Sequence, residues 1–441
     1  MSKLKFNFRY VAVLSLACLT PVILATAQAQ TSDIVSTATI PISTVQGCLQ
    51  MDDVLDLAGR RAPSVMIARA SEEEASADID QARSLYRPRL DAVGRTGVGD
   101  TGVVDSGVSN SVGFRASQRV IDFGDAKYAR RSARADFAAA QNNTLQAARD
   151  ASTQAGFALL EYYEALAQIE LTKRRYEYFA QQLRSIDNLL QTGGATRTER
   201  ASVASQLSEA EGFVLELEFR RDRSRTQIEI ATRATSPICN VLKENSDRST
   251  ERYMLVDQAV TDALEYNPTL GALRDRAEGE AARAKREARA RLPIISVVAT
   301  GAYSSIGGFD QFEYRDRVGI DVTVPLYAGN SLRAQKRRAN ARETAARARV
   351  FDQELQLRED VTITWQRLNS LKKQLASRIE VERQTRLQFE AAEIEAGAGT
   401  ITYRDLVELR LEFEQAGLAR IRTTYDLEQQ KLVLRSLTGR V

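Results

Sequence analysis

The chain has 441 residues, of which 43% are hydrophobic, 27% charged and 7% aromatic, with eight prolines, three cysteines and no histidine. The lack of histidine excludes enzymes that depend on a Ser-His-Asp or Cys-His couple, on an imidazole general base, or on histidine-ligated zinc or iron. The charge content is average, which argues against a wholly disordered chain.

Residues 1–29 are predicted to be a secretory signal peptide. Three basic residues precede an apolar run over 10–26, and the small residues 27–29 follow, which is the order found in such signals. An uncleaved membrane anchor is the alternative, and Pro21 within the run disfavours it. Residues 30–48 then form an N-terminal linker.

The mature chain is predicted to be neutral, with neither a nucleic-acid partner nor a cofactor. The signal peptide holds three of the 61 basic residues and none of the acids, which leaves 58 basic and 58 acidic residues. The basic stretches alternate with acids, whereas nucleic-acid binding needs basic residues gathered on one face. The glycine pattern at 97–102 resembles a dinucleotide motif, but no helix opens directly after it. No metal site is predicted either.

Two cysteines remain after the signal peptide, Cys48 and Cys239. An oxidising compartment permits them to pair. One disulfide and two separate buried thiols are the alternatives that the sequence leaves open.

The chain contains a tandem repeat of one sequence unit. Several landmarks recur 205 residues apart, namely Pro63 and Pro268, Pro88 and Pro293, and Gly124 and Gly329. Further on the offset becomes 204, with Gly193, Thr196, Thr198 and Arg200 matching Gly397, Thr400, Thr402 and Arg404. One inserted or deleted residue is therefore expected between the two sets.

We predict repeat 1 over 49–235, an inter-repeat loop over 236–252, and repeat 2 over 253–441. Each repeat reads as helix, β-hairpin, very long helix, tight turn and medium helix. In repeat 1 these segments are 51–85, the hairpin 88–123, 125–192 and 200–233. In repeat 2 they are 256–291, the hairpin 293–328, 330–396 and 402–438.

The long helices follow from proline placement and hydrophobic spacing. No proline occurs over 89–236 or 326–441, so nothing in those stretches forces a helix to break. Apolar or small residues recur at alternating steps of three and four from Leu145 to Leu190, which predicts a heptad packing seam. The helix over 125–192 would be roughly 100 Å long, about the length of the two shorter helices of its repeat stacked end to end.

Inside both hairpins the hydrophobic period changes to two. Val318, Ile320 and Val322 alternate with small or polar residues, and each predicted strand has about ten residues, the length that a tilted transmembrane strand needs. The Gly/Asp/Ser-rich segments 100–109 and 304–313 are predicted to be the hairpin apices.

The predicted fold class is mainly α with a β-barrel part. Four strands cannot close a barrel, and a sheet in lipid may leave no edge unpaired, so other copies must complete the wall. Three protomers would supply twelve strands. A soluble four-stranded sheet packed on helices is the alternative, and neither hairpin has the two-sided apolar pattern of such a sheet.

The whole mature chain resembles the TolC family of outer-membrane efflux and type I secretion channels. The resemblance rests on the tandem unit, on Pro88 and Pro293 before the strands, and on the strand-to-helix junctions 117–124 and 322–329. It implies a homotrimer with a twelve-stranded barrel in outer-membrane lipid and a helical tunnel in the periplasm. It also implies a periplasmic adaptor protein and an inner-membrane pump or ABC transporter as partners.

The resemblance also implies roles for the two helix-turn-helix tips. The tip residues expected to contact the adaptor are Gly193, Gly194, Thr196, Gly397, Gly399 and Thr400. Ordinary turn glycines that end a helix are the alternative reading of these positions.

Past the second tip, Asp405 and Glu408 resemble the family's acids at the periplasmic constriction, and Glu199 occupies the related place in repeat 1. Threefold symmetry would make each acid a ring that attracts cations. Tyr403 and Arg404 are expected to latch neighbouring helices. A solvated helix end is the alternative for all five.

The sequence therefore predicts a passive outer-membrane exit channel that is not an enzyme. A soluble periplasmic coiled-coil scaffold is the alternative function.

Overall fold

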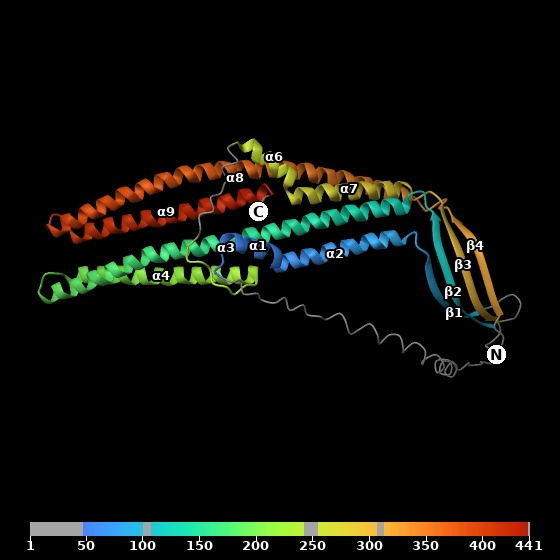
Figure 1. Ribbon diagram of the computed structural model, residues 1–441, viewed down its shortest axis with the longest axis horizontal. Coiled ribbons are helices and arrows are strands. Elements are labelled where there is room, and N and C mark those ends of the chain that lie inside the picture. The colour runs from blue at the N-terminus through green and yellow to red at the C-terminus, as the bar shows by residue number, and fades with distance from the viewer. Residues whose placement is uncertain (1–46, 100–106, 242–254, 307–312, 440–441) are drawn as a thin grey trace, which may run out of the picture. The chain divides into compact units, whose positions relative to one another are not determined.

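The structure, a computed structural model, describes residues 47–99, 107–241, 255–306 and 313–439 (Figure 1). The predicted signal peptide and nearly all of the predicted linker lie outside the described residues, as does most of the inter-repeat loop. Within the described residues, no helix has a stretch both long enough and apolar enough to cross a membrane.

Both repeats contain the same succession of elements, which confirms the predicted fold class of two helical repeats that each carry a β-hairpin. Repeat 1 holds α1 (Met51–Arg61), α2 (Pro63–Ser84), β1 (Arg89–Gly99), β2 (Gly107–Ile121), α3 (Asp125–Gln191) and α4 (Arg197–Thr232). Repeat 2 holds α6 (Val256–Tyr266), α7 (Pro268–Ala288), β3 (Ile294–Ile306), β4 (Glu313–Thr323), α8 (Ser331–Gly397) and α9 (Tyr403–Leu437).

The first helix predicted in each repeat is two helices, so the single helices expected over 51–85 and 256–291 were wrong. Pro63 and Pro268 each occupy the first turn of the second helix. The residues before them, Ala62 and Asn267, have ψ values of 142° and 119°. A residue that precedes proline is driven out of the helical region, and proline has no N–H to donate, so each helix ends there.

The offset between the repeats is 205 before the hairpin apices and 206 after them. Gly99 pairs with Gly107 in the first hairpin, and the equivalent Ser304 pairs with Glu313 in the second, which is therefore one residue longer at its apex. The long helices α3 and α8 both have 67 residues and begin 206 apart. The offset of 205 expected for Gly124 and Gly329 was wrong, because the N-cap residue equivalent to Gly124 is Asn330. The offset of 204 expected at the tips was wrong as well, because residues of the same type there do not occupy equivalent positions.

The four strands form one antiparallel sheet in the order β1-β2-β3-β4. The β2–β3 pair joins the two repeats, and β1 and β4 are the edges (Figure 1). Directly paired residues share a face of the sheet, and the register places apolar side chains on one face. The large exposed ones include Leu90, Val112, Phe114, Val297, Tyr303, Tyr314, Val318, Ile320 and Val322. The other face carries Arg95, Arg115, Arg317 and Asp321.

The heptad stripes form the helical core, as predicted. In repeat 2, Leu357, Val361, Leu368 and Leu371 of α8 pack with residues of α6, α7 and α9. An equivalent cluster in repeat 1 joins α1, α3 and α4. Leu145, at the start of the predicted seam, is an exception, because 56% of its surface is exposed.

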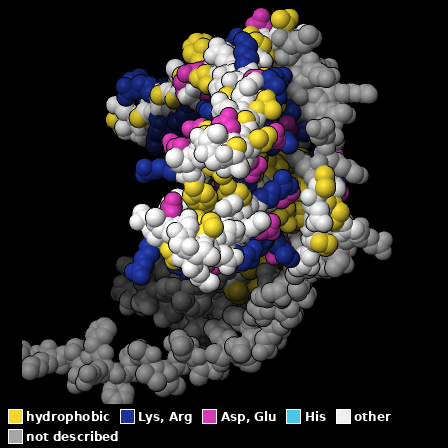
Figure 2. Space-filling view, turned by 90° about the vertical axis from the view of Figure 1, so that its left-hand side faces the viewer, with side chains coloured by type: hydrophobic (Ala, Val, Ile, Leu, Met, Phe, Trp, Pro, Cys, Tyr) yellow, Lys and Arg dark blue, Asp and Glu magenta, His cyan; other side chains and the backbone are white. Residues whose placement is uncertain are grey.

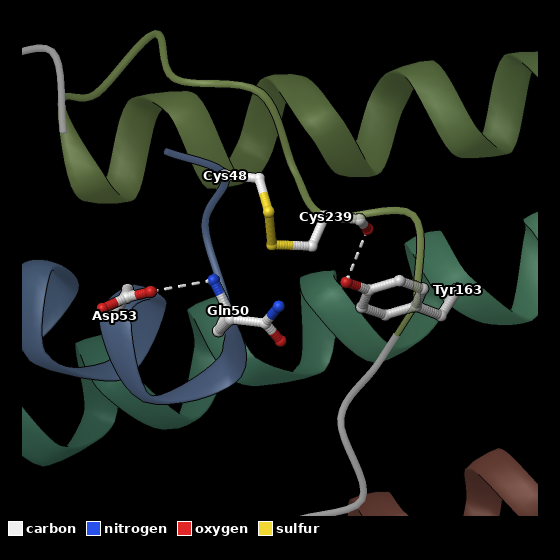
Figure 3. Close-up of a disulfide and its surroundings, with 5 residues drawn as sticks. All are labelled: Cys48, Gln50, Asp53, Tyr163 and Cys239. Atoms are coloured by element: carbon white, nitrogen blue, oxygen red, sulfur yellow. Dashed lines mark hydrogen bonds between the residues drawn. A yellow bond between two sulfur atoms is a disulfide. The ribbon is translucent and has the colours of Figure 1, made fainter. Parts of the chain in front are cut away.

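A disulfide joins Cys48, before α1, to Cys239, after α4 (Figure 3). The two segments also pair as backbone, since Leu49 N–H donates to Pro237 O at 2.8 Å and Cys239 N–H donates to Leu49 O at 3.2 Å. The hydroxyl of Tyr163, in the middle of α3, donates to Cys239 O at 2.8 Å. The two ends of repeat 1 are thus fastened together and to the long helix between them.

Replacing both Cys48 and Cys239 by Ser should lower the apparent melting temperature of the purified protein. The disulfide restricts the unfolded chain over a long loop, so its loss should cost about 2–5 kcal/mol. Thermal unfolding followed by circular dichroism in detergent measures the change. Tyr163→Phe is the matched control, which removes one hydrogen bond and should have a much smaller effect. Equal melting temperatures for the double variant and the parent would contradict a stabilising disulfide.

Candidate functional site

The two helix-turn-helix tips lie at the same end of the helices, away from the sheet (Figure 1). Each helix ends with a glycine at positive φ, Gly193 at 78° and Gly399 at 74°. In both turns a backbone N–H reaches back across the helix end, from Gly194 to Leu189 O at 2.8 Å and from Thr400 to Glu395 O at 3.0 Å. This is the Schellman geometry, which requires glycine at one position of each tip.

The equivalent tip residues are therefore Gly193 with Gly399 and Thr196 with Thr402, rather than Gly193 with Gly397 and Thr196 with Thr400. Gly397 belongs to the last turn of α8, and Gly194 has no positive φ. The turn accounts for Gly193 and Gly399 by itself. Contact between the tips and an adaptor stays a prediction for all six residues.

Each tip leads into a helix that a threonine caps. Thr196 Oγ1 accepts from the backbone N–H of Glu199 at 3.2 Å, and Glu199 Oε2 accepts from the N–H of Thr196 at 2.7 Å. Thr402 and Asp405 make the same reciprocal pair before α9, at 3.3 Å in both directions. Hydrogen bonds from the Thr196 backbone and hydroxyl lower the pKa of the exposed Glu199. Two of the three candidate constriction acids therefore start helices.

Glu408 differs from Asp405 in this respect. Both side chains are exposed, and the spacing of three puts them on neighbouring positions of one helix face. The carboxylate of Glu408 makes no hydrogen bond or ion pair with any part of the chain that the structure describes. Of the three candidate constriction acids, it is the one whose carboxylate remains fully available to ions or to another chain.

Tyr403 packs inward and Arg404 points to solvent. Tyr403 and Val407, both on α9, pack against an apolar cluster that includes Phe179 and Val203 of repeat 1. Burial raises the pKa of Tyr403, and its hydroxyl has no hydrogen-bond partner among the described residues. Arg404 is exposed, with no ion pair in the same residues. Within one chain neither forms the expected latch, so a latch to another copy stays a prediction.

A buried charged cluster that the sequence analysis missed joins the two repeats behind the tips. Arg410 Nε donates to Glu414 Oε1 at 2.7 Å, and the other oxygen of Glu414 lies 3.5 Å from Arg175 Nε on α3. Burial raises the pKa of Glu414, and the two arginines oppose that shift. We call Arg175, Arg410 and Glu414 the buried clamp.

Aromatic rings enclose the Arg410 guanidinium of the clamp. Its central carbon lies 4.8 Å from the ring centre of Tyr178 on α3, 4.9 Å from that of Phe389 on α8 and 5.9 Å from that of Phe413 on α9. Such cation–π contacts gain strength when they are shielded from water. The clamp thus ties three helices from both repeats together near their tips.

A sequence signal for the clamp existed in the heptad pattern. Glu414 lies seven residues after Val407 and seven before Ile421, so a carboxylate occupies a position of an apolar seam. A charge at such a position must find a partner when the seam packs, and Arg410 one turn earlier provides it.

The clamp borders a groove of about 910 Å³ between α3, α8 and α9, lined by Phe389, Phe413 and charged side chains such as Glu382 and Arg420. Figure 2 looks onto the tip end of the molecule, where acidic and basic side chains are interspersed. Among the described residues, no cluster of acidic or cysteine side chains is arranged to hold a metal ion.

The chain matches a known family over both repeats. Residues 54–233 and 259–440 fit the sequence model of the outer membrane efflux protein family. The chain belongs to this family. It is therefore a protein of the bacterial outer membrane with a periplasmic helical extension, and it is not an enzyme.

Individual relatives agree with this assignment. The outer membrane efflux protein BepC of Brucella suis biovar 1 (strain 1330) is 21% identical over 365 residues, which cover 82% of this chain and 78% of BepC. The CmeC outer membrane channel of Campylobacter jejuni has a TM-score of 0.76 at 16% identity, covering 88% of this chain and 85% of CmeC. The open MtrE outer membrane channel of Neisseria gonorrhoeae has a TM-score of 0.72 at 16% identity, with 89% of each chain covered.

Removing one partner of the buried clamp should destabilise the protein. Arg410→Met keeps the contacts to the rings but leaves Glu414 buried with only the more distant Arg175, which should cost about 3–5 kcal/mol. The double variant Arg410→Met/Glu414→Leu should regain most of that loss, because an apolar pair replaces the buried charges. Thermal or denaturant unfolding in detergent measures both.

Arg383→Met is the control for the clamp, because it breaks only the exposed Arg383–Glu380 pair one turn apart on α8. This variant should leave the unfolding midpoint unchanged. If Arg410→Met/Glu414→Leu is no more stable than Arg410→Met, the loss of stability in Arg410→Met does not come from leaving the Glu414 carboxylate buried without Arg410.

Proposed function

We propose that three copies of this chain form a passive exit channel from the periplasm to the exterior. The observation that carries this proposal is the four-stranded sheet, which has one apolar face and two edges, β1 and β4, without a partner strand in the described chain. Lipid does not hydrogen-bond backbone groups, so the edges must pair with those of other copies. Twelve strands from three copies would close a barrel with the polar face inward.

The helices would continue the barrel as a tunnel that ends at the two tips of each copy. An adaptor protein contacting the tips would connect the tunnel to an inner-membrane pump or ABC transporter, either for drug efflux or for type I secretion of a polypeptide. The family and the names of BepC, CmeC and MtrE support an efflux or channel role. A soluble scaffold would not expose Leu90, Phe114, Val318 and Ile320 to water at 64–76% of their surface.

Fractionation and planar-bilayer recording test this proposal. The protein should co-sediment with the outer membrane, need detergent for extraction, migrate as a trimer, and open ion-conducting pores in a planar bilayer. A protein that is released by osmotic shock and stays monomeric in water without detergent would overturn the proposal in favour of the scaffold.

Removing the acid rings proposed at the tip should change conduction. Neutralising the pair with Asp405→Asn/Glu408→Gln should raise single-channel conductance or weaken block by a divalent cation such as Mg²⁺. Each ring would hold three carboxylates, so the half-blocking concentration should rise by about tenfold. Single-channel recording at several Mg²⁺ concentrations measures this.

Glu408→Gln alone separates ion attraction from helix capping, because Asp405 also caps α9 whereas Glu408 does not. Glu216→Gln, which neutralises an exposed acid on α4 away from the tips, is the control and should leave block unchanged. Identical conductance and block in the parent and in the Asp405/Glu408 variant would remove the acid ring from the proposal.

A further inference from the structure

Ion pairs between α3 and α7 are part of the contact between the two repeats inside the chain. Arg131 on α3 bonds Glu278 on α7 at 2.9 Å, and Asp136 on α3 bonds Arg283 on α7. Alanine side chains of α3, such as Ala135 and Ala139, are buried at this end of the helix. We call this contact, together with the β2–β3 strand pair at the sheet end of these helices, the internal seam.

The elements equivalent to α3 and α7 in the other repeat are α8 and α2. In the chain α2 packs on α3, and α8 packs on α7 and α9, so α2 and α8 lie on opposite sides of the internal seam (Figure 1). Their outer sides are the two borders of the chain. If copies surround a common axis, the α8 border of one copy must meet the α2 border of the next.

The two borders carry opposite charge. Residues 331–350 of α8 contain seven basic residues and one acid, Glu343, the basic ones being Arg333, Lys336, Arg337, Arg338, Arg342, Arg347 and Arg349. α2 contains five acids and two arginines, the acids being Glu72, Glu73, Glu74, Asp78 and Asp80. Opposite potentials on two surfaces favour their association and fix its register.

The repeat offsets turn this general complementarity into specific pairs. Adding 206 to a residue number on α3 gives the equivalent residue on α8, and subtracting 205 from a residue number on α7 gives the equivalent residue on α2. The residues equivalent to Arg131 and Glu278 are therefore Arg337 and Glu73, again a base with an acid. Asp136 and Arg283 become Arg342 and Asp78, in which the two charges have exchanged helices. All four border side chains are exposed, and none forms an ion pair within the described chain.

Apolar and small residues on the borders follow the same equivalence. Ala272 of α7 is 2% exposed in the internal seam, and its counterpart on α2, Ile67, is 69% exposed. Gly271 of α7 approaches Asn142, where an added Cβ would lie 3.1 Å from the side chain. The equivalent positions hold Met66 and Ala348, so at the borders the larger side chain lies on the helix equivalent to α7 and the smaller one on the helix equivalent to α3.

The strand edges give a third charged pair by the same operation. Arg115 of β2 lies opposite Thr300 of β3. The equivalent residues at the edges of the sheet are Asp321 of β4 and Arg95 of β1. If β4 of one copy pairs with β1 of the next in the same register, these two residues lie opposite each other. Both side chains are exposed and lie on the polar face of the sheet. Opposite charges directly across a strand pair are stabilising.

We propose that the seam between copies reproduces the internal seam, with α8 and β4 of one copy against α2 and β1 of the next. The pairs Arg337–Glu73, Arg342–Asp78 and Asp321–Arg95 then join different copies. This inference rests on the proposed trimer and adds its register.

Charge reversal tests the pairing on the full-length protein in detergent. Arg342→Asp and Asp78→Arg should each lower the temperature at which the trimer dissociates on a native gel, by about 5–10 °C. The double variant Asp78→Arg/Arg342→Asp restores opposite charges, now with the acid on α8 and the base on α2, as in the Asp136–Arg283 pair of the internal seam. It should recover most of the loss in dissociation temperature. Asp80→Arg/Arg342→Asp is the matched control, which adds the same charge two residues away and should not recover it.

A cross-link gives a second readout that does not depend on stability. Met66→Cys/Ala348→Cys should yield covalently linked dimers and trimers on oxidation or with a short thiol cross-linker, whereas each single substitution should yield none. Intact trimers that do not cross-link, or a double charge reversal without recovery, would overturn the seam but leave the channel standing. A parent protein that forms no trimer would instead overturn the proposed function itself.

Discussion

Backbone hydrogen bonding in lipid is the constraint on which the rest of this structure depends. A sheet of four strands has two edges, and each edge holds a row of N–H and C=O groups that hydrocarbon leaves unpaired. In the proposed channel the apolar face of the sheet lies in lipid, and its two edges pair with those of further copies. The helices would be arranged around the same axis as the strands, because α3 and α8 continue directly from β2 and β4.

The tandem repeat offers a simple way to meet this constraint. A contact that already works between the repeats of one chain can be used again between chains, provided that the borders keep compatible residues. Small residues persist on α8, where Ala341 and Ala345 are exposed counterparts of the buried Ala135 and Ala139 of α3. The charges are compatible without being identical, which allows the two kinds of seam to differ in partner preference.

The tips show where the repeats diverge. Both turns have the same Schellman geometry and the same threonine cap, because these are requirements of the backbone. The buried clamp has no counterpart in α4, where Ala204 and Ser208 occupy the positions of Arg410 and Glu414. Glu408 likewise corresponds to Ser202. The chain therefore concentrates its charged chemistry in the second repeat, beside groups that hold both repeats together.

The sequence by itself determined the two repeats, the long helices and the strands, because recurring residues, periodicity and proline placement are local properties of the chain. The outer-membrane class came from the resemblance of the sequence to a known family. It did not reveal that Pro63 and Pro268 divide the single helices predicted over 51–85 and 256–291. The correct offset at the tips was also decided by the tertiary structure, since backbone φ and capping, and not residue identity, define equivalent positions there. The disulfide and the buried clamp join residues far apart in the chain, and only packing brings such groups within reach of each other.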